Sequence, residues 1–493
     1  MKKQQITEKN NKGKKQNIFL KPILFFAGSN DGELSIRFEG IMQYIPLIVC
    51  GGFFLLTILN FAFGPLDWNI KNPLKLYSFL IACVFSLTSG YLVAVVKGRT
   101  PTVRVGIDVN KLQILCIIIS LAIYIPTVYT RTGKFYPDIY TGLTNTGVAY
   151  RNSKFHAENS SQLFEYIRFL LGPFLIMVTP VTLFFMPKLS KMTKIFGIVV
   201  IILTTMIGIS QGINKYCADV TAQIVIYLAL LFFVKKEKGK NLRHKIKTLL
   251  IMVLVFVLFF SYYVVTMRNR VSFDCTADSS VTLSDEATNK AMVQNSKMSH
   301  STVREDYILF RYLPDKIKSA GTFLASYVSH GYKGLSIAMD REFTSTYGLG
   351  FSQFFRHNIL KPFGGQPLEE KIEKRTYADK TRAEAWYTGE IWSSFFVFPA
   401  SDIGFPGTVL LVFFIGYLWA LSWKDALISH NPFAVATFLN LCFMVIYFSA
   451  NNQLFQGGES FIGFTVVFAA WLITRWQAMK KGKAIKLEGE TAD

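Results

Sequence analysis

Ten apolar runs, each long enough to cross a bilayer as a helix, alternate with shorter polar segments along residues 41–475. The runs lie at 41–63, 76–96, 112–130, 164–186, 195–213, 219–234, 248–266, 402–422, 432–450 and 458–475. A single long polar segment, 267–390, interrupts them. The pattern predicts an all-α polytopic integral membrane protein with about ten transmembrane helices and one large loop, where we expect chemistry at one membrane face.

Basic residues mark alternate segments between these runs. Lys and Arg resist translocation, so segments rich in them favour the cytoplasmic side. The basic segments are 2–15, 97–111, 188–194, 235–247 and 475–486, together with Lys424. They predict that both termini are cytoplasmic and that the large loop is external.

Five regions follow from this topology. They are a basic cytoplasmic segment with a candidate interfacial helix (1–40), seven transmembrane helices (41–266), an external loop with amphipathic helices (267–390), three transmembrane helices (391–475) and a cytoplasmic tail (476–493). The composition agrees, because 51% hydrophobic and 15% aromatic residues exceed what a soluble domain usually shows. The net charge of +21 is spread over the short connections, so it indicates topology and predicts no nucleic-acid partner.

The six cysteines have no close pairing that would favour a zinc ribbon or a disulfide framework. Cys50, Cys83, Cys116 and Cys442 fall inside the expected spans and are interpreted as packing residues. Cys217 and Cys275 fall on the outer side, where a disulfide between them is an open alternative.

Ionisable residues avoid the middles of the spans and gather at their outer ends. They are Glu165, Arg168, Lys215, Asp219, Arg268, Arg270, Asp402 and Glu459. A carrier needs polar or charged groups near the midplane of the bilayer to bind its cargo. The distribution therefore favours an enzyme that works at the outer interface over a transporter.

Arg268 and Arg270 follow the seventh run on the outer side, against the usual bias of basic residues. A lipid diphosphate at headgroup depth would compensate them, since guanidinium groups hold phosphate oxygens through paired hydrogen bonds. The alternative is that both arginines reach ordinary phospholipid headgroups.

The external loop offers candidates for acid–base chemistry. His330 and His357 each have a side chain that titrates near neutral pH, although a surface histidine without a role is a common alternative. Glu384 is a candidate base for an acceptor hydroxyl, or an ion-pair partner of nearby arginines. Asp340, Arg341 and Glu342 imitate an acidic pair only weakly, and no metal-binding motif is evident, so we expect metal-independent chemistry.

The eighth run carries a resemblance to a known family. Its sequence from Ser394 through Ser401-Asp402-Ile403-Gly404 to Gly407, followed by Gly416, is similar to the signature of Wzy-type O-antigen and capsule repeat-unit polymerases. Ser394 and Ile403 stand where the family usually has Thr and Phe, and Ile391 where Asn is frequent. The span count and the late external loop fit the same family. The spacing of Arg131 and Gly147 also occurs in some members, although glycine is common enough to match by chance.

The resemblance implies a glycosyltransferase of the broad C-type membrane fold, in the cytoplasmic membrane of a bacterium. Donor and acceptor would be oligosaccharides on undecaprenyl diphosphate, which leaves as the acceptor hydroxyl attacks. No cofactor is implied, and a chain-length co-polymerase is an implied partner. We take Arg268, Arg270, Arg341 and Lys215 as candidates for holding the diphosphate. Glu384, Asp402 and His330 are candidates for the base, and Asp402 has an alternative role as a helix cap.

Two rival functions stay open. An O-antigen ligase uses the same donor but transfers the glycan to a lipid A core. A polysaccharide flippase belongs to another class and should have more spans, no large loop and buried polar groups.

Overall fold

The computed structural model describes residues 40–490, apart from 102, 160–161, 235–240, 277–282, 298–300, 305–306 and 389–390. In this part of the chain, nine helices are long and apolar enough to cross a bilayer, and a shorter apolar helical run spans Leu47–Phe63. All ten expected apolar runs are therefore helical, and the expectation of a multi-pass, all-α membrane protein is confirmed. The expected interfacial helix before residue 40 lies outside the described residues.

The helices follow one another with short connections outside the large loop. They are α1 (Gly52–Phe63), α2 (Pro73–Lys97), α3 (Val109–Ala122), α4 (Tyr124–Thr132), α5 (Ile139–Thr144), α6 (Thr146–Asn159), α7 (Gln162–Leu175), α8 (Val178–Phe184), α9 (Lys191–Ser210), α10 (Lys215–Phe232), α11 (Asn241–Thr276), α12 (Asp285–Lys297), α13 (Asp315–Tyr327), α14 (Gly331–Met339), α15 (Gln353–Phe355), α16 (Lys361–Glu373), α17 (Tyr377–Lys380), α18 (Val397–Ile428), α19 (Pro432–Ile446) and α20 (Gly458–Glu490). Short 3-10 or π turns lie at Gly40–Gln43, Leu47–Gly51, Met186–Lys188, Arg356–Leu360, Thr381–Glu384 and Tyr447–Ser449. Two short strands, β1 (Leu66–Asp67) and β2 (Thr302–Val303), pair antiparallel with Leu66 opposite Val303.

Glycines let α2 and α18 pack with their backbones in contact. A Cβ on Gly90 would lie 2.0 Å from the carbonyl oxygen of Phe413, and a Cβ on Gly416 would lie 2.2 Å from that of Leu87. Small residues permit such close approach in a bilayer, where van der Waals packing drives helix association. Gly416 of the signature therefore has a packing role.

A second close contact joins α7 to α20. A Cβ on Gly172 would lie 2.6 Å from the carbonyl oxygen of Glu459, and one on Gly463 would lie 3.1 Å from that of Gly172. This contact brings the first turn of α20 beside α7, although nearly three hundred residues of chain separate the two helices. The side chains at these two helix ends consequently face one cavity, described below.

The helix α18 is broken at Gly404, whose φ of 71° and ψ of 171° are open mainly to glycine. Pro406 follows the break and cannot donate a backbone hydrogen bond. The helix begins at Val397, earlier than the predicted span at 402–422, and the signature lies at the break rather than at a helix start.

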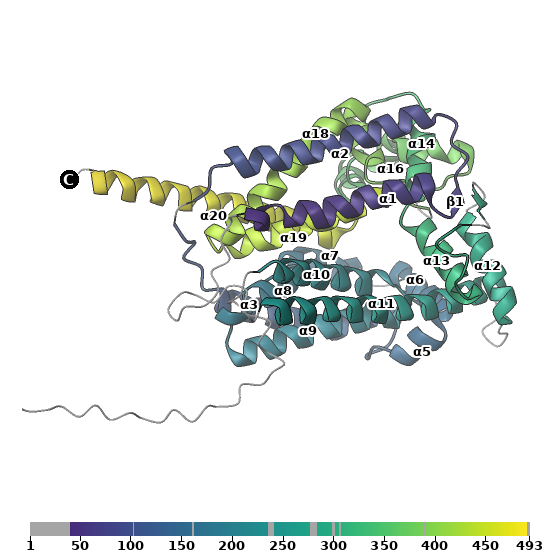
Figure 1. Ribbon diagram of the computed structural model, residues 1–493, viewed down its shortest axis with the longest axis horizontal. Helices are drawn as coiled ribbons and strands as arrows, with labels where there is room; N and C mark the ends of the chain where they lie inside the picture. Colours follow the sequence, from purple (N-terminus) through teal and green to yellow (C-terminus); the bar gives the residue numbers. More distant parts are fainter. Residues whose placement is uncertain are drawn as a thin grey trace, which may run out of the picture.

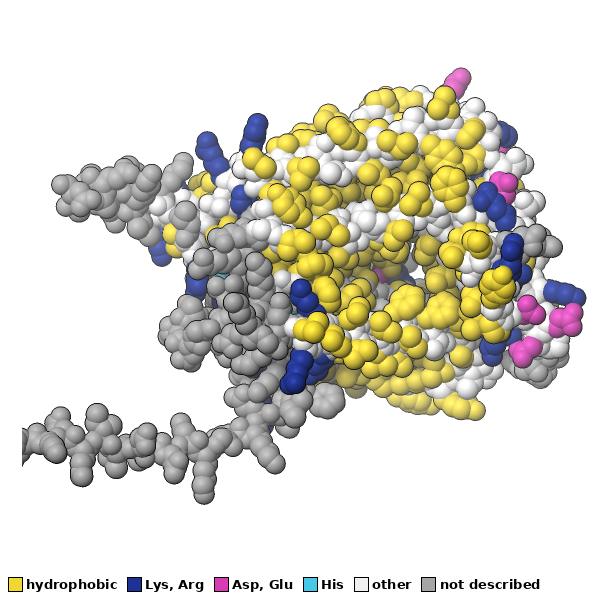
Figure 2. All heavy atoms as spheres, viewed as in Figure 1, with side chains coloured by type: hydrophobic (Ala, Val, Ile, Leu, Met, Phe, Trp, Pro, Cys, Tyr) yellow, Lys and Arg dark blue, Asp and Glu magenta, His cyan; other side chains and the backbone are white. Residues whose placement is uncertain are grey.

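Connections 98–101, 103–108, 188–190 and 429–431 meet at one end of the bundle, here called the basic end. The N–H of Val105 donates to the carbonyl of Ser429 at 3.1 Å, and Lys424 Nζ donates to the carbonyl of Gly98 at 2.9 Å. In Figure 2, the charged side chains visible at this end are Lys and Arg, whereas both signs are visible at the opposite end.

The described part of the large loop folds into a cap over the opposite end, here called the loop end. Figure 1 shows α12 and α13 standing there beside α5, α6 and the end of α11. Tyr263, Met267 and Val271 of α11 share a buried cluster with Met292 and Phe323 of the cap. The cap is also fixed to the bundle, because the Tyr332 hydroxyl lies 2.8 Å from that of Thr57.

The seventh span extends beyond its predicted end at residue 266. α11 continues to Thr276, because 267–276 contains no glycine or proline to end it. Arg268 and Arg270 consequently lie on a helix rather than in the loop.

The cysteines expected to pack inside the spans do so as thiols. Cys50, Cys83, Cys116 and Cys442 are buried and free. Cys217 is also a buried free thiol, so the alternative disulfide with Cys275 is not formed. The side chain of Cys275 lies outside the described residues.

Candidate functional site

A cavity of about 600 Å³ lies between α3, α4, α7, α8, α9, α10, α19 and α20, and extends to the segment 453–457. Residues at the loop ends of these helices surround the part of the cavity nearer the cap. Residues nearer the middle of the helices form its deeper walls. The face in Figure 2 is hollowed between α1 and α11, and acidic and basic side chains are visible inside the hollow. The described helices therefore enclose space at the level where charged groups occur.

Two arginines and two glutamates form a chain of ion pairs at this level. Arg168 Nη2 lies 2.9 Å from Glu165 Oε2, and Arg168 Nη1 lies 3.0 Å from Glu459 Oε2. Arg131 Nη2 lies 2.8 Å from the same Oε2 of Glu165. Helices α4, α7 and α20 are thus joined by charges that are each costly to bury alone.

A second ionic group stands at the start of α10. Lys215 Nζ lies 2.5 Å from Asp219 Oδ2, and the Tyr447 hydroxyl donates to Asp219 Oδ1 at 2.8 Å. The side chain of Lys215 is 45% exposed, although it lines the cavity. Its side chain is therefore accessible to a molecule that enters.

Several buried polar atoms around the cavity have no hydrogen-bond partner among the described residues. Those on neutral side chains are Gln211 Nε2, Gln223 Oε1 and the Tyr124 hydroxyl. The Nε atoms of Arg131 and Arg168 are in the same condition. Buried polar groups normally have partners, so a concentration of unpaired ones at a cavity indicates a site built for a polar ligand or water.

The deeper walls are formed mainly by apolar side chains, with the polar Gln223 and Asn440 among them. The apolar residues include Ile176, Val178, Val200, Ile201, Leu439 and Phe443. A polar, charged level next to an apolar floor suits an amphipathic ligand whose ionic head and hydrocarbon chain occupy different depths.

The charges around the cavity balance. Arg131, Arg168 and Lys215 are basic, and Glu165, Asp219 and Glu459 are acidic; these six residues are here called the ion ring. A balanced ring needs no added ion to be stable. An anionic ligand must therefore compete with one of the carboxylates for a cation.

Arg270 lies outside the residues that line the cavity. Its guanidinium carbon is 3.6 Å from the ring centroid of Tyr150, and no ion pair or hydrogen bond joins its side chain to another described residue. Arg268 differs, because it is 6% exposed and donates to Asp285 at 2.6 Å and to Asn289. Arg268 therefore ties α11 to α12, and its position does not suit the diphosphate role expected for it.

His330 is buried between its hydrogen-bond partners. Nδ1 lies 3.0 Å from the carbonyl oxygen of Ser326, and Nε2 accepts the N–H of Trp392 at 3.3 Å, which fixes the neutral Nδ1–H tautomer. Burial lowers the pKa of the imidazole to about 4. With both nitrogens occupied, His330 lacks the geometry of the general base that the sequence suggested.

The carboxylate of Asp402 anchors the loop 346–351. Oδ1 accepts the N–H of Gly348 at 2.8 Å, the N–H of Gly350 at 2.9 Å and the hydroxyl of Thr346. Oδ2 accepts the N–H of Phe351 at 2.8 Å. Both oxygens are thus engaged, which favours a structural role, although the bonds go to a neighbouring loop rather than to a helix cap.

Glu384 is an ion-pair partner at the loop end. Its carboxylate lies 2.7 Å from Arg341 Nη2 and 3.1 Å from Lys71 Nζ. The alternative of a structural ion pair therefore accounts for Glu384 and Arg341 together. His357 likewise contacts Glu369, at 2.8 Å.

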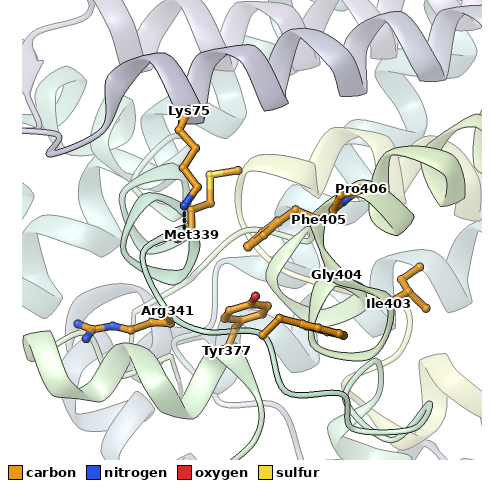
Figure 3. A pocket seen from close by; sticks show the side chains of 9 residues that line it. Lys75, Met339, Arg341, Tyr377, Ile403, Gly404, Phe405 and Pro406 are labelled. Carbon is orange, nitrogen blue, oxygen red and sulfur yellow. Dashed lines mark hydrogen bonds between the residues drawn. The ribbon is translucent and has the colours of Figure 1, made fainter.

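Arg341 also borders an open groove of about 410 Å³ beside the break in α18. Figure 3 shows Lys75 reaching from α2 to the carbonyl of Met339, with Tyr377 and Phe405 across the groove. Arg341 points away from the break at Gly404 in this view. This groove and the cavity have no lining residue in common.

The structure therefore brings together one part of the expected site and separates the rest. Lys215 lines the cavity, together with Arg168, Asp219 and Glu459 from the outer ends of the spans. The larger group of predicted site residues, Glu384, Asp402, His330, Arg268, Arg270 and Arg341, lies elsewhere.

Other cavity residues were not expected to contribute. Gln211, Gln223 and Tyr124 are polar groups within spans, and only a search for uncharged polar residues near helix ends would have pointed to them. The sequence singles out Arg131 only through its spacing from Gly147, which itself packs against Phe273.

The chain matches no protein-family model, no curated protein and no solved structure.

Proposed function

We propose that this protein joins oligosaccharide repeat units carried on undecaprenyl diphosphate into a surface polysaccharide, either O-antigen or capsule. The observation that carries the proposal is the cavity, whose ion ring lies above an apolar floor. A polyprenyl diphosphate has matching parts, namely an ionic head and a long hydrocarbon chain. The resemblance of 394–416 to repeat-unit polymerases supports the same assignment.

Arg168, Arg131 and Lys215 are the cations proposed to hold the diphosphate. Because the ion ring is balanced, the diphosphate must displace a carboxylate. Glu459 is the candidate for release, since Arg168 is its one ion-pair partner among the described residues and its side chain is 34% exposed. Glu165 is held by two arginines and is 16% exposed, so it stays in place.

The displaced Glu459 would then serve as the general base. The acceptor hydroxyl loses its proton to Glu459 and its oxygen bonds to the anomeric carbon of the donor sugar. The bond from that carbon to the diphosphate oxygen breaks, and undecaprenyl diphosphate leaves with the electron pair, stabilised by the cations. This assignment replaces Glu384, Asp402 and His330, whose atoms are engaged elsewhere.

The orientation proposed for this reaction places the basic end in the cytoplasm and the loop end outside, as the positive-inside bias favours. Both termini are then cytoplasmic, in the cytoplasmic membrane of a bacterium. A fold of the C-type glycosyltransferase kind and a chain-length co-polymerase as partner belong to the same proposal.

Glycan length in cells tests the function. A strain lacking the protein would be complemented with wild type, Lys215→Ala or Lys134→Ala at matched expression. Lys134 is the control because it is also 45% exposed and also pairs with an aspartate four residues later, Asp138. Wild type and Lys134→Ala should restore a ladder of lengths, whereas Lys215→Ala should leave single repeat units, since one lost cation costs about 3 kcal/mol of barrier.

Other results would contradict the polymerase. A deletion strain that keeps full-length chains unattached to their final anchor would indicate a ligase.

A flippase for lipid-linked glycan is a second candidate, favoured by the polar Gln223 and Asn440 in the cavity wall. Its loss would leave single repeat units on the cytoplasmic side of the membrane, where the proposed polymerase would leave them outside.

A further inference from the structure

A cluster of cations stacked on aromatic rings lies where α6 meets α11. Arg270 is 3.6 Å from the ring centroid of Tyr150, and Lys154 Nζ is 5.0 Å from the same centroid. Arg151 lies 4.6 Å from the ring centroid of Phe273. These residues are here called the stacked cluster.

The cations of the stacked cluster lack acidic partners among the described residues. No ion pair within 4 Å joins Arg151, Lys154 or Arg270 to a carboxylate, although Asp274 and Glu158 lie on the same helices. This contrasts with the ion ring, where every cation has a carboxylate partner. A surface that keeps cations unpaired and ordered by stacking is suited to an anion from outside.

A pair of aromatic side chains connects the stacked cluster to the cavity. Burial raises the pKa of the Tyr327 phenol to about 12. The positive charge of Arg270 is near enough to act in the opposite direction and lower this pKa. The ring centroids of Tyr327 and Trp392 are 4.5 Å apart, and Trp392 is 6.4 Å from Tyr447, which lines the cavity. Tyr327, Trp392 and Tyr447 are each partly exposed residues.

We propose that Arg270, with Arg151 and Lys154, binds a carboxylate-bearing sugar of the lipid-linked repeat unit, while Tyr327 and Trp392 cover the apolar face of a sugar. The proposal rests on the proposed function and narrows its substrate to an acidic glycan. A stacked guanidinium keeps its N–H edges free, and these edges match a carboxylate in a bidentate contact.

The position of the stacked cluster separates it from the diphosphate site. The ion ring lies beside the apolar floor, where the lipid part of the donor would be held, and the stacked cluster lies beyond Tyr447, towards the cap. A glycan that leaves the diphosphate towards the outside would pass along these rings. Arg270 is therefore assigned to the sugar rather than to the leaving group.

Binding to purified, full-length protein tests this inference without requiring turnover. The probes are an oligogalacturonate and a neutral malto-oligosaccharide of equal length, with farnesyl diphosphate as a third ligand. The variants are Arg270→Ala, Arg270→Lys and, as a control, Arg311→Ala, because Arg311 is an exposed cap residue that forms no ion pair with another described residue.

Arg270→Ala should weaken oligogalacturonate binding at least about tenfold, as expected for a lost charge-assisted pair. Arg270→Lys should weaken it less, and Arg311→Ala should leave it unchanged. Farnesyl diphosphate should bind Arg270→Ala as it binds wild type. If Arg270→Ala loses farnesyl diphosphate and keeps the glycan, Arg270 belongs to the leaving group and the inference is overturned.

Two further outcomes would also overturn it. One is equal affinity of wild type for the acidic and the neutral oligosaccharide. The other is a loss of binding in Arg270→Ala only towards nanodiscs rich in anionic phospholipid, which would make the stacked cluster a headgroup site. Failure of the polymerase proposal would appear separately, as an intact glycan ladder in cells lacking the protein.

Discussion

Arg168 on α7 lies 3.0 Å from Glu459 on α20, at the charged level of the cavity. The pair exists because Gly172 and Gly463 let the two helices approach closely. It belongs to the ion ring, whose three basic and three acidic residues balance in charge. Any anion that enters must therefore exchange places with a carboxylate, and the most exposed carboxylate bound to Arg168 is Glu459.

Replacing Glu459 with Gln should separate binding from turnover. Loss of the competing charge should tighten the binding of farnesyl diphosphate about fivefold, because Arg168 no longer has to break an ion pair with Glu459. Loss of the proposed base should lower the rate of chain extension about a hundredfold. Titration calorimetry and a gel assay measure the two effects. Glu286→Gln, which removes an exposed pair with Lys290, should change neither. Weaker binding in Glu459→Gln would show that the pair only holds the helices together.

Replacing Asp402 with Asn should destabilise the loop 346–351. The amide retains one acceptor oxygen, so at least one loop N–H now accepted by the carboxylate loses its partner. The expected cost is about 1–3 kcal/mol, seen as a lower midpoint of thermal unfolding in detergent and faster proteolysis in this loop. An inactive variant with unchanged stability would instead support Asp402 as a catalytic group.

Replacing Gly416 with Ala should force α2 and α18 apart. The new Cβ would lie 2.2 Å from the carbonyl oxygen of Leu87, which is backbone and cannot turn aside. We expect a loss of about 2 kcal/mol or more, as for overpacked interiors. Gly52→Ala in α1 is the matched control, because a Cβ there meets nothing within 4 Å. Equal unfolding temperatures for the two variants would contradict the packing described for this helix pair.

Acid should destabilise the cap through His330. Its folded pKa of about 4 lies below the ordinary 6.5, so the unfolded chain binds the proton first as pH falls. Stability is complete above pH 6.5 and declines towards pH 4, by about 2 kcal/mol at pH 5. His330→Gln should reduce the slope of unfolding temperature against pH. A slope is expected to persist, because burial and Lys188 also lower the pKa of His430 to about 4. An unchanged slope in His330→Gln would show that groups other than His330 take up the protons that destabilise the protein.

The membrane helices could be predicted from sequence because each apolar run is local and long. The break in α18 could have been suspected from Gly404 and Pro406, but the bonds that Asp402 makes to a loop fifty residues earlier could not. Local sequence also gives Arg268 and Arg270 the same surroundings. Their contacts differ because Asp285 in the cap pairs with Arg268, whereas Arg270 lies over the ring of Tyr150.

The cavity likewise depends on contacts between segments that are distant in the sequence. The outer ends of the spans indicated Arg168, Lys215 and Glu459 as a group, because charges avoid the hydrocarbon. Their pairing depends on which helices are neighbours, and α7 meets α20 through glycine contacts that no local pattern specifies.

We propose that the protein forms glycosidic bonds between lipid-linked repeat units at this cavity. The most direct test of this proposal supplies purified protein in nanodiscs with undecaprenyl-diphosphate-linked repeat units alone, and follows both glycan length and released undecaprenyl diphosphate. We expect chains that grow by whole repeat units, with one undecaprenyl diphosphate released per bond, and loss of both products in Lys215→Ala but not in Lys134→Ala. Repeat units that stay single in wild type, with no undecaprenyl diphosphate released, would contradict it.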